Sequence, residues 1–211
     1  MRIKCFQLGA LWTNCYVVWS GDGDAIIVDP GGPAAEVREF VAHNGLRVRK
    51  ILLTHGHGDH IMGLGDVRDM ASDGVSIHSQ DADCLTSASK NLSSAMGAGA
   101  VFKPADFRIG DGEVIYAGDM SIRVMHTPGH TKGGCCFYIT EGDEELLLSG
   151  DTLFARSVGR TDLPGGDEGE LIESLKKLDA YSDALKVYPG HGPATTLGDE
   201  RRLNPFWPAA V

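Results

Sequence analysis

A chain of 211 residues, 42% of them hydrophobic, is long enough to bury a substantial core, and it fits one domain over residues 1–211 better than two. The formal net charge of −10 repels polyphosphates, and no run of Lys or Arg could follow a nucleic-acid backbone, so nucleic-acid binding is disfavoured. No apolar stretch approaches the roughly 20 residues that cross a bilayer, and the first residues lack a signal-peptide pattern. We therefore expect a cytoplasmic protein without a membrane partner, and its oligomeric state is left open.

The five cysteines argue against both a disulfide framework and a thiolate zinc site. They are odd in number and show no CxxC spacing, so reduced and mostly buried thiols are expected. Cys135 and Cys136 are adjacent in a strand-like run, which predicts side chains on opposite faces of a sheet.

The first third of the chain predicts a β meander followed by a helix. The runs IKCFQL, CYVVW and AIIVD, between Ile3 and Asp29, are rich in β-branched and aromatic residues and are separated by Gly- and Asp-containing turns. Pro33 suits a helix start and Asn44-Gly45 a helix stop, so a helix is predicted over residues 34–43.

The middle and end of the chain predict further strands and two more helices. After a strand over residues 50–54, we expect a helix over 60–71, a short strand over 75–78 and an irregular excursion over 81–100. Strands are expected near 121–125, 134–140, 146–149 and 185–189. Between the last two, Asp167 and Glu170 resemble a capping box and open a predicted helix over 168–181.

Four of the apolar runs end in a short Gly- or Pro-rich turn that carries a metal-ligand residue. KILLT precedes His55, SIRVM precedes the TPGHT of His130, ELLLSG precedes Asp151, and LKVYPG precedes His191. If these strands end at one edge of a pair of sheets, the four turns converge there, where rigid scaffolds place their sites.

The segment THGHGDH places four potential ligands in six residues, namely His55, His57, Asp59 and His60. Its spacing suits a tight loop that runs into a helix N-terminus. Imidazole and carboxylate without thiolate suit zinc, iron or manganese. With His130, Asp151 and His191 there are seven ligands, which is more than one tetrahedral ion uses, so two divalent ions are expected.

The remaining histidines have simpler interpretations. His43 at a helix end favours the helix dipole and receives no role. For His78 and His126 a structural hydrogen bond is favoured over ligation, although His126 is near enough to TPGHT to support a ligand. The set of seven is different, because burying five imidazoles and two carboxylates without a metal would leave costly unpaired polar groups.

The pattern HxHxDH at His55–His60, with His130 in TPGHT, Asp151 in SGDTLF and His191 in PGHGP, resembles the metallo-β-lactamase superfamily. The stretches GDTLFARSVGRTDLPGGD and TTLGDERRLNPF are similar to its glyoxalase II-like, or hydroxyacylglutathione hydrolase-like, branch in the short bacterial form.

This resemblance implies an α/β fold, a four-layer αββα sandwich with the metals at one edge of two facing sheets. It also implies that His55, His57 and His130 hold one metal, that Asp59, His60 and His191 hold the other, and that Asp151 bridges them, with Asp59 and Asp151 as catalytic residues. Zinc is expected first, with iron or manganese as alternatives. About twenty residues follow His191, whereas glyoxalase II proper carries there a helical segment that contacts glutathione, so glutathione recognition is left open.

The resulting hypothesis is a metal-dependent hydrolase that cleaves a small-molecule thioester such as S-lactoylglutathione by a metal-bridging hydroxide. Lys132, Arg156 and Arg160 are candidates to hold an anionic substrate, with solvated surface charge as the alternative. An iron-dependent persulfide dioxygenase, whose family shares GRTD (159–162) but uses a single iron, is the nearest rival. A non-catalytic metal-binding protein remains an alternative, whereas a β-lactamase is disfavoured without a signal peptide and a nuclease without a basic groove.

Overall fold

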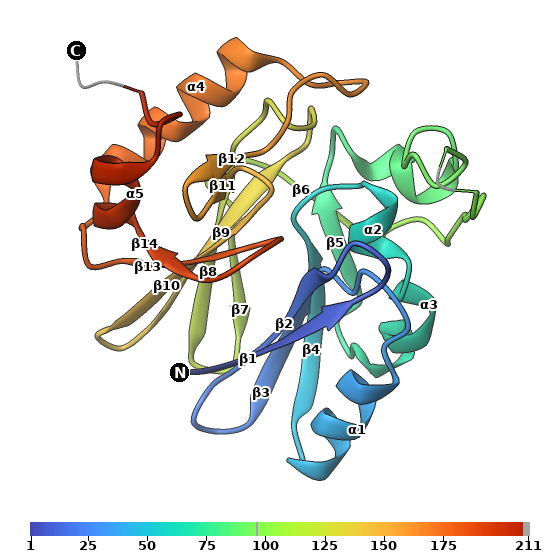
Figure 1. Cartoon of the computed structure of the whole chain (residues 1–211). Helices are drawn as coiled ribbons and strands as arrows, with labels where there is room; N and C mark the ends of the chain where they lie inside the picture. Colours follow the sequence, from blue (N-terminus) through green and yellow to red (C-terminus); the bar gives the residue numbers. More distant parts are fainter. Residues whose placement is uncertain (96, 209–211) are drawn as a thin grey trace.

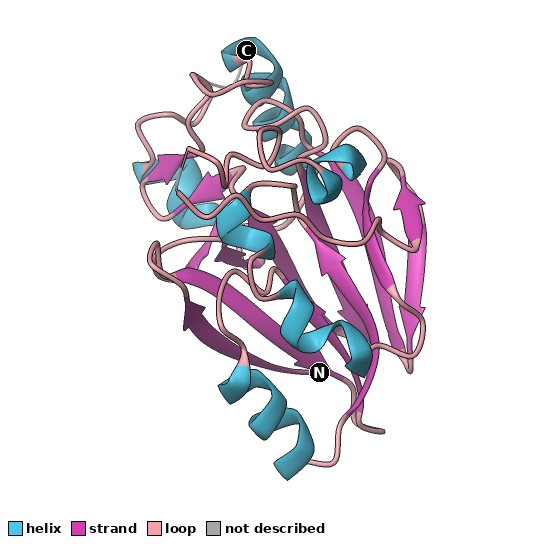
Figure 2. Ribbon diagram, turned by 90° about the vertical axis from the view of Figure 1, so that its right-hand side faces the viewer, coloured by secondary structure: helices cyan, strands magenta, loops and turns pink. Residues whose placement is uncertain are grey.

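Two six-stranded β-sheets lie face to face at the centre of the protein, and helices cover the outer side of each (Figures 1 and 2). The computed structural model describes residues 1–95 and 97–208. Helices α1 (Ala35–His43), α2 (Gly58–Ile61) and α3 (Leu64–Val67) lie beside the first sheet, and α4 (Glu168–Lys177) and α5 (Leu197–Leu203) beside the second. This arrangement is the expected four-layer αββα sandwich.

The first sheet has the order β1-β2-β3-β4-β5-β6. Its first three strands pair antiparallel as the predicted meander, and its last four run parallel to one another. The strands are β1 (Arg2–Leu8), β2 (Thr13–Trp19), β3 (Asp24–Val28), β4 (Arg47–Leu53), β5 (Val75–His78) and β6 (Phe107–Ile109).

The second sheet has the order β14-β13-β10-β9-β8-β7. Strand β9 is antiparallel to both β8 and β10, and β10 is parallel to β13, so β8, β10 and β13 point the same way. The strands are β7 (Val114–Ala117), β8 (Met120–His126), β9 (Cys135–Glu141), β10 (Glu144–Gly150), β13 (Lys186–Pro189) and β14 (Thr195–Thr196), with a separate hairpin of β11 (Leu153–Phe154) and β12 (Ser157–Val158).

Alternating side chains divide the core into layers, as the period of two along a strand requires. Val18 and Phe137 belong to the core between the sheets, whereas Val17 packs under the helices of the first sheet. Cys135 lies between the sheets and Cys136 on the side of α4, so their predicted opposite orientation is confirmed. All five cysteines are free thiols.

The helix predicted over residues 60–71 is wrong, because the segment is broken into α2, α3 and a 3-10 turn at Arg68–Met70. The backbone N–H of Gly63 donates to Pro30 O at 2.7 Å, outside the segment, so it makes no bond that would continue a single helix. The helix expected over 168–181 ends at Lys177 and continues as a 3-10 turn to Ala180. Half of the predicted capping box is present, since the Asp167 side chain accepts from the N–H of Glu170, whereas the N–H of Asp167 donates to Gly129 O.

Other elements were not anticipated from the sequence. Helix α5 and the short strands β6, β7, β11, β12 and β14 lacked clear periodicity. The excursion over 81–100 is largely irregular, as expected, apart from a 3-10 helix at Ala82–Thr86, and its residue 96 lies outside the described residues. Within the described ranges, no helix combines the length and the apolar character that a bilayer crossing requires.

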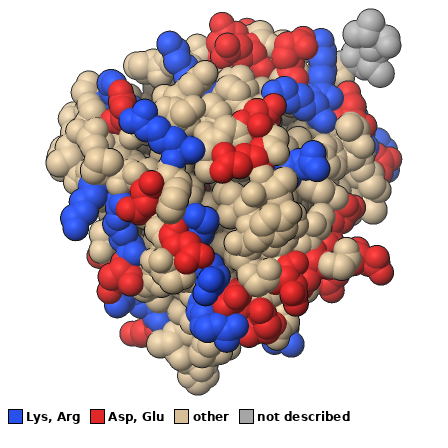
Figure 3. Space-filling model, turned by 180° about the vertical axis from the view of Figure 1, so that it is seen from behind, with Lys and Arg blue, Asp and Glu red and all other residues tan. Residues whose placement is uncertain are grey.

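Charged side chains of both signs are mixed on the surface. On the face seen in Figure 3, Lys and Arg lie among Asp and Glu and form no continuous basic patch. The whole chain has 29 acidic and 19 basic residues.

Candidate metal centre

The strand ends singled out by the sequence meet at one edge of the two sheets. Strands β8, β10 and β13 end there in the second sheet, and β4 ends opposite them in the first (Figure 1). The turns after these strands carry His130, Asp151, His191 and the segment 55–60, in which Asp59 and His60 lie on the short helix α2. The structure thus brings all seven predicted ligands to one place.

The seven side chains form three overlapping groups that could each hold an ion. Within each group the ligand atoms lie within 4.8 Å of one another. The groups are His55, His57 and His130; His55, His60 and Asp151; and Asp59, His60 and His191.

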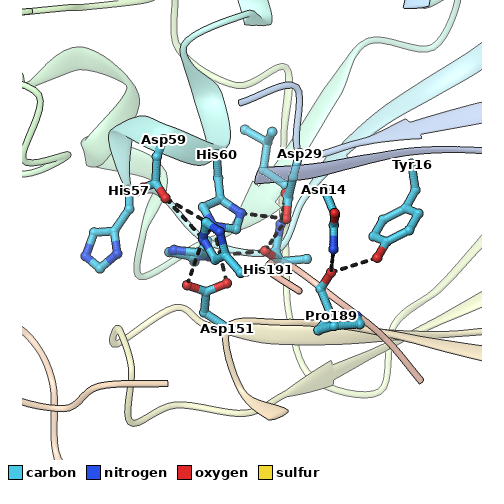
Figure 4. A network of polar contacts seen from close by, with 12 residues as sticks. Asn14, Tyr16, Asp29, His57, Asp59, His60, Asp151, Pro189 and His191 are labelled. Carbon is cyan, nitrogen blue, oxygen red and sulfur yellow. Dashed lines mark hydrogen bonds and ion pairs between the residues drawn. The ribbon is translucent and has the colours of Figure 1, made fainter. Parts of the chain in front are cut away.

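The Asp151 carboxylate lies within reach of imidazoles from each of these groups of ligands, and Figure 4 shows it facing His60 and His191. Its Oδ2 is 3.6 Å from Nε2 of His130 and 3.6 Å from Nε2 of His191, and its Oδ1 is 3.3 Å from Nε2 of His60. A Cβ at Gly190 would lie 2.2 Å from Asp151 Oδ1, so only glycine lets the His191 turn approach this carboxylate.

Oxygen acceptors behind three of the rings fix which ring nitrogen faces the site. Nδ1 of His60 donates to Asp29 Oδ2 at 2.9 Å, Nδ1 of His130 to the carbonyl of Arg160 at 2.7 Å, and Nδ1 of His191 to the carbonyl of Leu11 at 3.2 Å. Each of these bonds leaves Nε2 facing the centre, the orientation that metal-binding imidazoles require.

The electrostatics favour the metal-binding form of two imidazoles and two carboxylates. Burial lowers the pKa of His55 well below its usual value and that of His57 to about 4, helped by neighbouring imidazoles. Burial alone would raise the pKa of Asp59 and Asp151, but the charge of His60 outweighs it and lowers both. Both carboxylates are therefore ionised at neutral pH. In contrast, burial alone would lower the pKa values of His60 and His191, but the nearby carboxylates raise both.

Two buried atoms at the centre test whether a cation fits. In the described part of the chain, His55 Nε2 and Asp151 Oδ1 are both buried without a hydrogen-bond partner. Leaving such groups unpaired is costly unless something else binds them. Since the donor set is imidazole and carboxylate, a divalent metal of the zinc, iron or manganese type fits these residues.

Two cavities adjoin the centre and share His57. One of about 360 Å³ is lined by five of the seven ligands, by Arg160 and by the aliphatic side chains of Leu11, Leu92 and Leu163. The other, of about 330 Å³, is lined by Lys90, Lys132, Gln80 and Thr131 among others.

The three basic residues proposed to hold substrate are therefore placed differently. Arg160 lines the first cavity and pairs with Asp162 at 2.7 Å, and Lys132 lines the second. Arg156 instead bonds the fully buried Glu200 at 2.7 Å and is absent from the linings of both cavities.

Sequence reasoning missed the residues that support the ligands. Asp29 accepts from His60 Nδ1 and also from the N–H and hydroxyl of Thr54. It ends the apolar run AIIVD before Pro30 and Gly31, so the strand-end pattern used for the ligands would have found it. Asn14 and Tyr16 on β2 both donate to Pro189 O, beside His191, at 2.9 and 2.7 Å (Figure 4).

The histidines outside the ligand set serve other contacts. His78 and His126 stack with ring centroids 4.0 Å apart, and His126 Nε2 bonds the carbonyl of Lys132. The structural hydrogen bond favoured for His126 is therefore present, and its ring faces His78.

Comparison with known proteins agrees with this architecture. The chain is 37% identical over 209 residues to a probable metallo-hydrolase, YqgX, of Bacillus subtilis, covering 98% of this chain and 97% of that one. It is 31% identical over 209 residues to the hydroxyacylglutathione hydrolase GloC of Haemophilus influenzae, covering 98% of each.

Solved structures show the same fold. A structure described as BLEG-1 B3 metallo-beta-lactamase matches with a TM-score of 0.92 and 38% identity over 97% of this chain and 99% of that one. TTHA1623 in a di-iron-bound form matches with 0.83 and 36% over 96% and 99%, and ETHE1 from Myxococcus xanthus with 0.79 and 26% over 97% and 84%. The family model of the metallo-beta-lactamase superfamily matches residues 8–191. With most of its length and its ligand-bearing turns inside that match, the chain belongs to the metallo-β-lactamase superfamily.

Proposed function

We propose that this metal-dependent hydrolase uses two divalent ions, zinc in the first instance, to cleave thioesters such as S-lactoylglutathione. The observation that carries the proposal is the pair of ligand triads with the buried Asp151 carboxylate between them. The likeness to the Haemophilus hydroxyacylglutathione hydrolase over 98% of both chains supports the thioester class.

The distances support the ligand roles that the family resemblance implies. His55, His57 and His130 form one half of the centre, and Asp59, His60 and His191 form the other. The two oxygens of Asp151 lie 3.3 to 3.6 Å from ring nitrogens of both halves, which suits a bridging carboxylate. Ions held there would supply Lewis acidity, lowering the pKa of bound water toward about 7 and polarising the substrate carbonyl.

The cavity favours a leaving group that needs no proton. Apart from the metal ligands, Arg160 is the one titratable side chain among its lining residues in the described part of the chain. A thiol has a pKa of about 8.5 and leaves readily as the thiolate. An amine leaving group would need a proton that these lining residues do not offer.

Two cavities that share His57 also suit a substrate with two arms. A thioester extends from its carbonyl in two directions, as an acyl group and as a thiol carrier. The aliphatic cavity beside Leu11 and Leu163 suits the acyl arm. In the other cavity Lys90 is paired with Asp83 at 2.8 Å, so Lys132 is the cation that could bind a carboxylate of the carrier.

The test is a thioester panel run on protein whose zinc, iron and manganese have been quantified. We expect two metal ions per chain and hydrolysis that depends on them, with S-lactoylglutathione and simpler S-acyl thiols compared for kcat/KM. Two bound metals with no thioester turnover would refute the activity and leave a non-catalytic metal-binding protein.

Two other activities have a specific observation behind them and belong in the same panel. Cleavage of a β-lactam is favoured by the 38% identity to a structure described as a B3 metallo-beta-lactamase, and nitrocefin hydrolysis above that of any thioester would overturn our preference. Persulfide dioxygenation is favoured by the likeness to Myxococcus ETHE1. It predicts one iron and oxygen consumption with glutathione persulfide.

A further inference from the structure

Asp81 is a buried carboxylate outside every ligand motif, and it lies three residues after β5. Asp81 is only 3% exposed. Its Oδ2 accepts from the N–H of Gly56 at 3.0 Å and from the hydroxyl of Thr131 at 2.8 Å. Its Oδ1 accepts from the N–H of Gly133 at 2.8 Å. Both oxygens therefore bind protein donors, and the charge is met by three short hydrogen bonds.

These donors lie on the two turns that hold one half of the metal centre. Gly56 stands between His55 and His57 in the turn after β4, which belongs to the first sheet. Thr131 and Gly133 follow His130 in the turn between β8 and β9, which belongs to the second sheet. One carboxylate thus ties together turns from different sheets, at the position where Nδ1 of His57 and Nε2 of His130 approach to 3.0 Å.

Asp81 is itself held firmly. Its N–H donates to His78 O at 3.0 Å, and its carbonyl accepts from the N–H of Cys84 at 2.9 Å. A Cβ at Gly133 would lie 2.6 Å from Asp81 N and 2.7 Å from its Cγ, so the second turn is seated directly against it. The position of the carboxylate is therefore fixed, and both turns are hydrogen-bonded to it.

We propose that Asp81 is a positioning residue that sets the spacing of His55, His57 and His130, and so the metal affinity of that half of the centre. The inference rests on the dinuclear centre of the proposed function and not on the thioester as substrate. A ligand spacing held by buried hydrogen bonds is pre-organised, and losing such support costs about 10- to 100-fold in metal affinity.

The decisive variant is Asp81→Asn, which keeps the shape but gives one position an N–H₂ group. That group faces either the N–H of Gly133 or the N–H of Gly56, so at least one turn loses its acceptor. We expect about 10- to 100-fold weaker binding of Co²⁺ or Zn²⁺ at one of the two sites in chelator competition, with the other site unchanged. The visible spectrum of the Co²⁺-loaded protein should change in the bands of the histidine-rich site.

Asp24→Asn is the matched control. Asp24 is another largely buried carboxylate, bonded by Arg47 Nε at 2.7 Å, but it lies at the opposite end of the first sheet, where β3 begins. Its loss should lower the melting temperature and leave both metal affinities and the Co²⁺ spectrum unchanged. If Asp81→Asn behaves the same way, Asp81 is only structural and the inference fails.

Thr131→Val covers the case in which Asp81→Asn does not fold. It removes one of the three donors and keeps the volume, so about 3- to 10-fold weaker binding at the same site is expected from the loss of one hydrogen bond. Equal weakening of both sites, or none, overturns the inference. Because every readout is metal binding, a chain that binds two ions yet hydrolyses no thioester would sink the proposed activity and leave this inference standing.

Discussion

The two halves of the metal centre use similar donor atoms but are supported in different ways. In the half formed by His55, His57 and His130, Asp81 holds the backbone of the ligand turns. In the half formed by Asp59, His60 and His191, Asp29 holds an imidazole directly, through His60 Nδ1 at 2.9 Å. Asp81 therefore positions the backbone of the ligand turns, and Asp29 orients the ring of one ligand, His60.

The halves also differ in charge. Burial and neighbouring imidazoles lower the pKa values of His55 and His57 in the first half. In the second half, burial alone would lower the pKa of His60, but the carboxylates of Asp151 and Asp59 raise it well above its usual value. His55 and His57 are thus held neutral in the first half, whereas the second half already contains opposite charges, and Asp151 lies between the two environments.

Asp151→Ala should affect both halves of the centre equally, because it removes a carboxylate that lies near the ligands of each. We expect loss of paired metal binding and a fall in turnover of more than about 100-fold, since even the loss of a supporting residue costs 10- to 100-fold. Metal content by elemental analysis should be measured together with kcat/KM. Full turnover with two metals still bound would refute the bridging role.

Asp29→Asn tests the half that contains His60, whereas Asp81→Asn tests the half of the three histidines. Asp29 has a φ of +50°, which Asn tolerates well, so the substitution removes an acceptor without straining the backbone. We expect roughly 10- to 100-fold weaker metal binding in the half that contains His60, and the Co²⁺ bands of the three-histidine half should persist. Weakening of the same site by Asp29→Asn and Asp81→Asn would abolish the distinction between the halves.

The ligands could be predicted from the sequence better than their supports. His55, His130, Asp151 and His191 follow apolar runs of strand length, and that local pattern alone placed them at strand ends. Asp81 gives no comparable signal, because its partners Gly56 and Gly133 lie 25 and 52 residues away and contribute only backbone N–H groups. Any residue except proline offers such a donor, so the contact exists only once the two sheets have come together.

The same reason accounts for the errors in the fold. Strands β9 and β10 are apolar and long enough to be recognised alone, and their bounds were predicted within two residues at each end. The segment 60–71 has helical composition, but the contact of Gly63 with Pro30 breaks it. Tertiary contacts decided these points, and they are not visible in a local window.

Tyr16→Phe tests a smaller feature of the second half, the seating of the His191 turn. The Tyr16 hydroxyl donates to Pro189 O at 2.7 Å, a carbonyl that Asn14 also binds. Because Asn14 remains, the lost bond should lower the free energy of unfolding by only about 1 kcal/mol. Urea unfolding measures this, and an unchanged free energy of unfolding would show that Asn14 alone seats the turn.

The smallest expected effect concerns the histidine pair outside both halves. Burial and the stacked ring of His126 lower the pKa of His78, with Asp81 and Asp111 acting weakly in the opposite direction. Some histidines have a lower pKa in the folded chain than in the unfolded chain. Such a histidine contributes stability at pH values above its unfolded-state pKa, and this stability is lost as the pH falls to its folded-state pKa. Wild-type protein in excess chelator should therefore lose stability between about pH 7 and the lower folded pKa. His78→Phe keeps a flat ring against His126 but cannot take up a proton, so its unfolding free energy should fall less steeply over the same range. Identical slopes in the two proteins would mean that acid acts through the metal-binding histidines and not through this stacked pair.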